Sequence, residues 1–339
     1  MANLLATLGE RAQSKRQWRW RGASLGLLWL GLALIIALAG YHLFEGLTAR
    51  NYQFFLSRRI PNLLAMVLAA IAIGASALVF QTITHNRILT PSILGFDALY
   101  ALLQVSLVVC LGKMHPWVLN PYLNFVWVTL AMVVSALLLF RLYFRVMAGQ
   151  IYPLLLIGIV CSALFSSMAD FMTLLVDPSE FTGIQDRLLA SFNRINTHLV
   201  FALILPMAAC LLWLWYLSPQ LDVMWLGSEN ATSLGINTAK LTHQVLICIT
   251  LMIAMATALV GPILFFGLIV VSVTRQLCQA FQHRILLIAS SGVAVLMLLF
   301  AHLLVVQLFS FSTTLSVVIN LIGGSYFLWL LTRQSMAQS

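Results

Sequence analysis

Three ionisable side chains lie inside long apolar runs, where a charged group is costly and is therefore usually functional. Asp97 follows Gly95-Phe96, Asp170 closes the stretch 166–170, and His302 lies in the run 285–306. Carboxylates and imidazoles at such depth can bind a coupling ion or relay a proton. They can equally be satisfied by hydrogen bonds between helices, which we favour for His302.

Hydroxyl and guanidinium groups form two further candidate sets. Ser162, Ser166 and Ser167 have i+4 and i+5 helical spacing, so they either line a path or allow two helices to pack closely. Arg58 and Arg59 lie just outside an apolar run. They either extend their charged ends to water or pair with acidic side chains on a soluble partner, Arg59 more than Arg58.

Other chemistry is excluded by what the sequence lacks. A P-loop needs Gly-x-x-x-x-Gly-Lys-Ser/Thr, and of the chain's lysines only Lys113 follows a glycine, with Met114 after it. No His-x-x-x-His or Cys/His cluster occurs, and no Cys-x-x-Cys, so we expect no bound metal or other cofactor. The chain should neither hydrolyse ATP nor act as an enzyme.

Composition defines the element that must position these residues. Of 339 residues, 62% are hydrophobic and 8% charged, with a mean hydropathy of +1.00. Runs of roughly 20 apolar residues predict membrane-spanning helices, so we expect an all-α polytopic membrane protein. Its ten expected spans are 24–44, 61–81, 92–112, 121–141, 152–176, 197–217, 241–260, 262–279, 285–306 and 313–332. The net charge of +9 reflects orientation in the bilayer and gives no case for nucleic-acid binding.

Charge placement predicts the topology. If the basic N-terminus is cytoplasmic, two thirds of the 18 lysines and arginines lie on the cytoplasmic side. Both termini are then cytoplasmic. We expect a basic N-terminal segment (1–23), one transmembrane domain (24–333) that begins with an uncleaved span, and a short cytoplasmic tail (334–339).

Two loops stand out by length and composition. Residues 218–240 form a cytoplasmic polar island, in which Ser228 is a suitable N-cap, Glu229 puts negative charge on the first turn, and Gly235 can end a helix in a left-handed cap. A helix of about two turns is unstable alone in water, so it must dock against something. The outer segment 177–195 predicts a short surface helix.

Four stretches resemble the FecCD-type permeases of ABC importers for iron-siderophore complexes and vitamin B12. They are Arg58-Arg-Ile-Pro-Asn62 with Gly74-Ala-Ser-Ala-Leu-Val-Phe-Gln81, His85-Asn-Arg-Ile-Leu-Thr-Pro-Ser-Ile-Leu-Gly95, residues 221–236, and Gly261-Pro-Ile-Leu-Phe-Phe-Gly267 with Gly323-Gly-Ser-Tyr-Phe327. The version around Leu94 looks most like permeases for ferric catecholate siderophores. The chain departs from the family pattern at Asn62, Val271-Ser272, Ala301-His302, Val306-Gln307 and Ser325.

The resemblance implies a type II ABC importer architecture and roles for particular residues. The loop helix would couple to an ATPase, with Leu226, Leu234 and Ile236 as apolar contacts and Glu229 and Asn230 as polar ones. The coupling set is Leu226, Gly227, Ser228, Glu229, Asn230, Ala231, Leu234, Gly235 and Ile236. Arg58 and Arg59 would dock a binding protein. The path or gate would include Ile151, Tyr152, Ser162, Ser166 and Asp170.

The resemblance also implies partners and a location. These are a second permease, like or unlike this one, two ABC ATPases that bind ATP and magnesium, and a periplasmic or lipid-anchored siderophore-binding protein. The site of action would be the lipid of a bacterial inner membrane. The alternative is an ion- or proton-coupled secondary transporter that uses Asp97, Asp170 or His302. A membrane enzyme acting on lipids would need a convergent catalytic cluster, which the sequence does not show.

Overall fold

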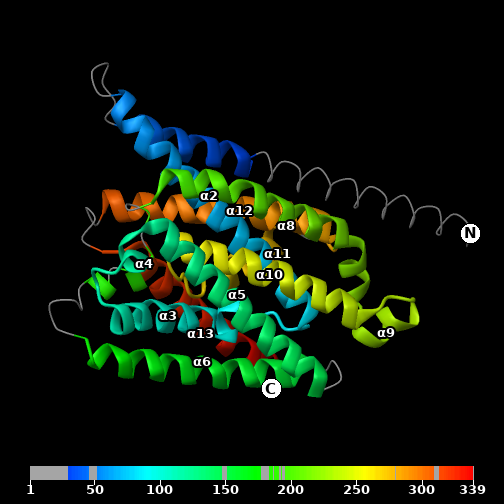
Figure 1. Cartoon of the computed structure of the whole chain (residues 1–339). Coiled ribbons are helices and arrows are strands. Elements are labelled where there is room, and N and C mark those ends of the chain that lie inside the picture. The colour runs from blue at the N-terminus through cyan, green and yellow to red at the C-terminus, as the bar shows by residue number, and fades with distance from the viewer. Residues whose placement is uncertain are drawn as a thin grey trace, which may run out of the picture.

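A computed structural model describes residues 30–45, 52–146, 151–176, 183–185, 187–190, 192, 195–278, 280–308 and 313–338, and these residues form helices and no strands (Figure 1). The first helix is Leu30–Phe44. The others are α2 (Tyr52–Ile83), η1 (Pro91–Leu94), α3 (Phe96–Leu111), α4 (Pro116–Leu119), α5 (Pro121–Val146), α6 (Ile151–Leu174), α8 (Thr197–Met224), α9 (Ser228–Ser233), α10 (Thr238–Val260), α11 (Phe266–Leu277), α12 (His283–Gln307) and α13 (Leu315–Gln338).

Each expected span corresponds to a helix in this part of the chain. Six helices are long and apolar enough to cross a membrane, namely α2, α5, α6, α8, α10 and α12. The other four expected spans contain shorter apolar helices: Leu30–Phe44, α3, α11 and α13. Helix α13 continues through residues 334–338, which we had expected to be a separate tail.

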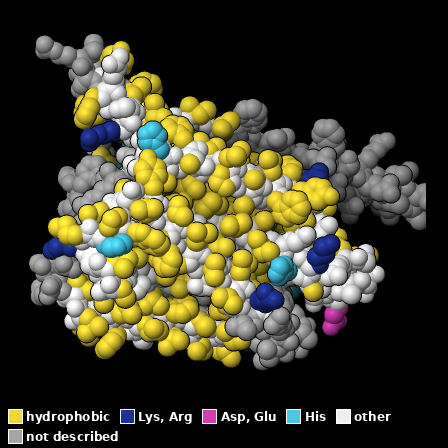
Figure 2. Space-filling view, viewed as in Figure 1, with side chains coloured by type: hydrophobic (Ala, Val, Ile, Leu, Met, Phe, Trp, Pro, Cys, Tyr) yellow, Lys and Arg dark blue, Asp and Glu magenta, His cyan; other side chains and the backbone are white. Residues whose placement is uncertain are grey.

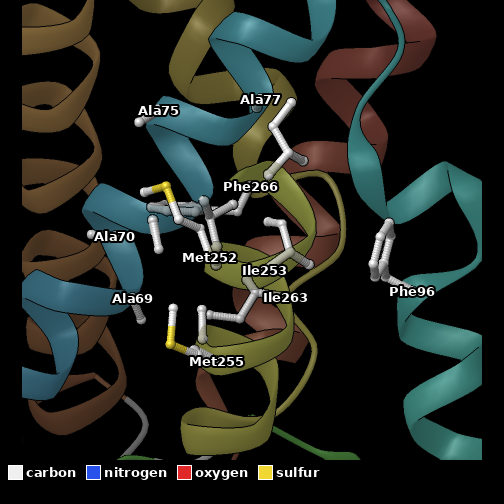
Figure 3. Packing of buried hydrophobic residues seen from close by; sticks show 14 of the residues in the cluster. Ala69, Ala70, Ala75, Ala77, Phe96, Met252, Ile253, Met255, Ile263 and Phe266 are labelled. Carbon is white, nitrogen blue, oxygen red and sulfur yellow. The ribbon is translucent and has the colours of Figure 1, made fainter. Parts of the chain in front are cut away.

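Helix α2 is the centre of the bundle because its side chains are small. It contacts α8, α10, α11 and α12, and its alanines belong to the same buried cluster as Met252 and Met255 of α10 and Phe266 of α11 (Figure 3). Small residues let helix backbones approach closely in a membrane. A Cβ at Gly74 would lie 2.9 Å from the Cβ of Ala294, and one at Gly267 would lie 2.7 Å from that of Ala77.

The other helices enclose this centre unevenly. Helix α6 packs on α3 and η1, where a Cβ at Gly158 would meet Leu94, and most of its remaining surface is exposed. Helix α8 packs on α2, α10 and α12 and also has an exposed apolar side. Hydrophobic side chains cover most of the face in Figure 2, and the lysines and arginines lie towards its two ends. This distribution is typical of a protein with a bilayer around its middle.

The outer segment 177–195 is described only in part. Residues 183–185 and 187–188 are helical. Ile184, Ala190 and Phe192 are buried, and the guanidinium of Arg187 donates to the carbonyl of Val118 at 2.9 Å. The described part of this segment is therefore packed into the end of the bundle.

Candidate functional site

Helix α9 projects from one end of the bundle, between the ends of α8 and α10 (Figure 1). Its N-cap is Gly227, with φ +108°, and Ser228 is the first helical residue, so the expected Ser228 cap is wrong by one position. The helix ends as expected, with Gly235 at φ +84°. The Gly235 amide donates to the Thr232 carbonyl and the Ile236 amide to that of Ala231, which is the Schellman arrangement.

The surface of α9 presents most of the predicted coupling residues to solvent. Leu226 and Leu234 are 60% and 65% exposed, and Glu229 is also exposed. Ala231 differs from the prediction, because it is completely buried beneath the helix and is unable to contact a partner. Ile236 is half-buried against the core. Its side chain therefore anchors the end of α9 to the bundle and offers little surface to a partner.

A partly buried polar network ties the end of α8 to α12 and α2. The Oδ1 atom of Asp222 accepts from the backbone amide of His283 and lies 2.6 Å from its Nδ1. The Nε2 atom of His283 lies 2.8 Å from the Thr82 hydroxyl, which donates to the Leu78 carbonyl. Because that hydroxyl has one proton, it accepts from Nε2. Nδ1 then faces the carboxylate of Asp222, whose Oδ1 atom also accepts the backbone amide of His283.

Trp225 follows α8 directly and is held by two arginines. The guanidinium of Arg275 lies 4.3 Å from the centre of its ring, and that of Arg87 lies 6.0 Å away. Both distances are in the range of cation–π attraction. No role for Asp222, His283, Thr82 or Trp225 was expected from the sequence. An acidic residue and an aromatic residue directly before the loop helix were the available signals.

At the opposite end, the two candidate docking arginines have different environments. Arg59 donates from Nη1 to the carbonyls of Leu43 and Glu45, at the end of helix Leu30–Phe44. Arg58 is exposed and lies over the ring of Phe54 at 4.9 Å. Arg59 is thus half-buried and donates to free carbonyls of a helix end, whereas Arg58 is exposed, and the docking role of both arginines stays a prediction.

A cavity of about 450 Å³, lined by both polar and apolar side chains, lies at this same end, between helix Leu30–Phe44, α2 and α12. The rings of His42 and His302 meet edge to face with centroids 5.0 Å apart, and both line the cavity. The Gln307 amide donates to Tyr41 at 2.7 Å and to Glu45 at 2.6 Å. His302 thus meets a second ring between helices, and the hydrogen bond that we favour for it stays a prediction.

The predicted path residues all belong to α6, and Ser162, Ser166 and Asp170 follow one another at four-residue spacing on it. A Cβ at Gly95 would lie 3.0 Å from the Cα of Ser162, so Ser162 lies at a close helix contact. Ser166 and Asp170 are exposed on α6. The side chains of Ile151 and Tyr152 lie outside the described residues, although α6 begins at Ile151.

Asp97 lies in the first turn of α3, and its Oδ2 atom has no hydrogen-bond partner among the described residues. These residues also contain no group of three or more histidines, cysteines or carboxylates that could hold a metal. The described residues therefore contain the exposed helix α9 and two polar regions. One is the network of Asp222 and His283 near α9, and the other is the cavity lined by His42 and His302 at the opposite end.

Comparison with known proteins identifies a matching family and relatives that align over most of their length. The model of the FecCD transport family matches residues 23–333. The chain is 41% identical over 308 residues to the petrobactin import system permease protein YclO of Bacillus subtilis (strain 168), covering 90% of this chain and 97% of that protein. It is 30% identical over 325 residues to the petrobactin import system permease protein FatC of Bacillus anthracis, covering 96% and 91%.

A solved structure shares the fold. It is an inward-facing conformation of a metal-chelate type ABC transporter, with a TM-score of 0.79 at 24% identity, covering 91% of this chain and 99% of that one.

Proposed function

The chain belongs to the FecCD transport family, and on that premise we propose that it is the membrane permease subunit of an ATP-driven ABC importer. Its cargo is a ferric siderophore, which it moves from the periplasm to the cytoplasm by alternating access. The stretch around Leu94 and the two petrobactin permeases among its relatives favour a siderophore of the catecholate type. A chelated iron of this kind needs a wide path and no metal ligands from the permease.

The observation that carries this proposal is the exposed, capped helix α9 at the tip of the bundle. Leu226 and Leu234 offer apolar contacts and Glu229 a polar one, in a helix too short to be stable alone. An ATPase that holds α9 can transmit its closure on ATP to the bundle, because the network of Asp222 and His283 fixes α8 to α12 and α2. Such rigid-body rocking is a known form of alternating access.

The remaining surfaces fit the other partners of an importer. The exposed apolar side of α6 is available to a second permease, identical or homologous. Arg58 lies at the end opposite α9, where a soluble binding protein would dock. ATP and magnesium are bound by the two partner ATPases. In this arrangement α9 and both termini (1–23 and 334–339) are on the cytoplasmic side of a bacterial inner membrane, around the transmembrane domain 24–333.

The rival function, an ion-coupled transporter, has weaker support. It needs ionisable groups that converge on a coupling ion. Asp97, Asp170 and His302 lie on three different helices, α3, α6 and α12, and Asp170 is exposed.

Uptake by a reconstituted system tests the proposal. The permease, its ATPase and its binding protein are placed in proteoliposomes, and uptake of radioactive ferric petrobactin is measured with and without ATP inside. We expect uptake to require ATP and to be lost in Leu234→Arg, because a charge would enter the apolar contact with the ATPase. The matched control is Met114→Arg, since Met114 is equally exposed, at 73%, on a loop away from α9.

The opposite outcome identifies the rival. Uptake that follows a proton gradient and is indifferent both to ATP and to Glu229→Arg would show a secondary transporter.

A further inference from the structure

A groove of about 310 Å³ lies beside α9, between the last turns of α8 and the first turns of α10. Trp213 and Tyr216 line it from α8, and Lys240 and Gln244 line it from α10. Gly235, which ends α9, and Asn237 form its floor between the two helices. The groove is therefore shared by the bundle and by the turn that supports α9.

The charge of the groove is positive and unbalanced. Lys240 contributes an ammonium group, and no aspartate or glutamate lines the groove. Lys240 also lies in the first turn of α10, where a cation opposes the positive end of the helix dipole. A bound anion would relieve this unfavourable placement. The complementary ligand is therefore negatively charged.

The aromatic side of the groove is exposed on the surface of α8. Trp213 and Tyr216 are 45% and 69% exposed, with ring centroids 5.8 Å apart. Tyr216 and Trp213 lie one and four residues before residue 217, where the expected span ends, so the surface of a bilayer around α8 would be at their level. Exposed tryptophan and tyrosine at the end of a span are typical of the lipid headgroup level.

The surface next to these rings is apolar and continuous with them. Leu212 and Leu205 of the same helix are 68% and 80% exposed. Figure 2 shows that hydrophobic side chains cover the middle of the molecule and that basic ones lie near the end that carries α9. A ligand with an anionic head and long apolar chains would match both parts of this surface.

We propose that this groove binds an anionic phospholipid of the leaflet on the α9 side. Its phosphate contacts the ammonium of Lys240 and the polar groups at the start of α10, and its acyl chains follow α8 past Trp213 and Tyr216. Because Gly235 lies in the groove, the headgroup braces the turn between α9 and α10. Lipid at this position would thus support α9, the helix that contacts the ATPase in the proposed function. This effect does not depend on which siderophore is carried.

Lipid retention by the intact complex tests the proposal. The permease is purified with its ATPase in detergent, and phosphatidylglycerol or phosphatidylcholine with the same acyl chains is titrated and counted by native mass spectrometry. We expect wild type to prefer phosphatidylglycerol and Lys240→Gln to bind it about fivefold more weakly. Lys240→Arg should restore binding, and Trp213→Leu should weaken the retention of both lipids.

The matched control is Arg141→Gln, which removes the same charge from an exposed position at the end of α5, outside the groove. Equal loss of phosphatidylglycerol in Arg141→Gln and Lys240→Gln would overturn the proposal, as would equal retention of both lipids by wild type. Displacement of the lipid by millimolar inorganic phosphate would instead indicate a site for the free anion. Crosslinking of Tyr216 to the ATPase would show that protein occupies the groove. Thermal unfolding of each variant without added lipid checks that it is folded.

Discussion

The carboxylate of Asp222 and the imidazole of His283 lie 2.6 Å apart, although 61 residues separate them in the chain. The same carboxylate oxygen accepts the backbone amide of His283, so it also caps the start of α12. Asp222 stands five residues before Gly227, where the loop leads into α9. The pair therefore joins the proposed coupling element to the body of the bundle.

Removal of this pair should uncouple ATP hydrolysis from transport. We expect Asp222→Ala and His283→Ala each to lower the number of siderophores moved per ATP several-fold, because α9 would move without α12 and α2. Each should also cost about 1.5 to 3 kcal/mol of stability as a hydrogen bond to a charged group. The double variant should be little worse than either single one, and additive losses would show that the two side chains act separately. Uptake and ATPase assays on the same proteoliposomes provide the ratio.

The left-handed cap of α9 should be sensitive to a single methyl group. Gly235 has φ +84°, a conformation that costs an L-residue about 1 to 2 kcal/mol. We expect Gly235→Ala to weaken binding of the ATPase to the permease without unfolding the bundle, because only the end of α9 is strained. Titration calorimetry or co-purification measures the affinity. Gly235→Asn is the control, since asparagine tolerates this conformation, and it should lose less.

Two glycines with different surroundings test the close packing of α2. A Cβ at Gly267 would lie 2.7 Å from the Cβ of Ala77, whereas one at Gly292 would meet nothing within 4 Å. Gly267→Ala should therefore destabilise the bundle by about 1 to 3 kcal/mol through overpacking. Gly292→Ala should stabilise helix α12 by about 0.5 to 1 kcal/mol. Thermal unfolding in detergent compares the two, and equal midpoints would contradict the packing described for α2.

Arg58 and Arg59 should affect different properties of the protein. Arg59→Ala leaves the carbonyls of Leu43 and Glu45 without their donor, so it should lower the unfolding temperature. Arg58→Glu should leave stability unchanged but weaken the binding protein several-fold, and more at low ionic strength, because an exposed charge acts through long-range attraction. Surface plasmon resonance at two salt concentrations measures this effect. A loss of affinity confined to Arg59→Ala would assign the docking role to that residue.

The sequence alone determined the features that arise from local physics. Apolar runs of bilayer length predicted ten spans, of which six are long apolar helices and four contain shorter ones in the described part of the chain. The polar stretch 218–240 predicted α9 and its end at Gly235. Both depend on neighbours within a few residues, so the chain's own order is sufficient. The Schellman cap at Gly235 needs only the carbonyls of Ala231 and Thr232.

Only the tertiary structure decided which side chains meet across helices. Thr82 and His283 are 201 residues apart in the chain, and no local pattern marks them as partners. The fold brings the end of helix Leu30–Phe44 to the guanidinium of Arg59, a contact that the sequence did not indicate. Ser162 lies at a helix contact because Gly95 is beside it. Such pairings follow from the order in which helices pack, which hydropathy leaves undetermined because every span is apolar.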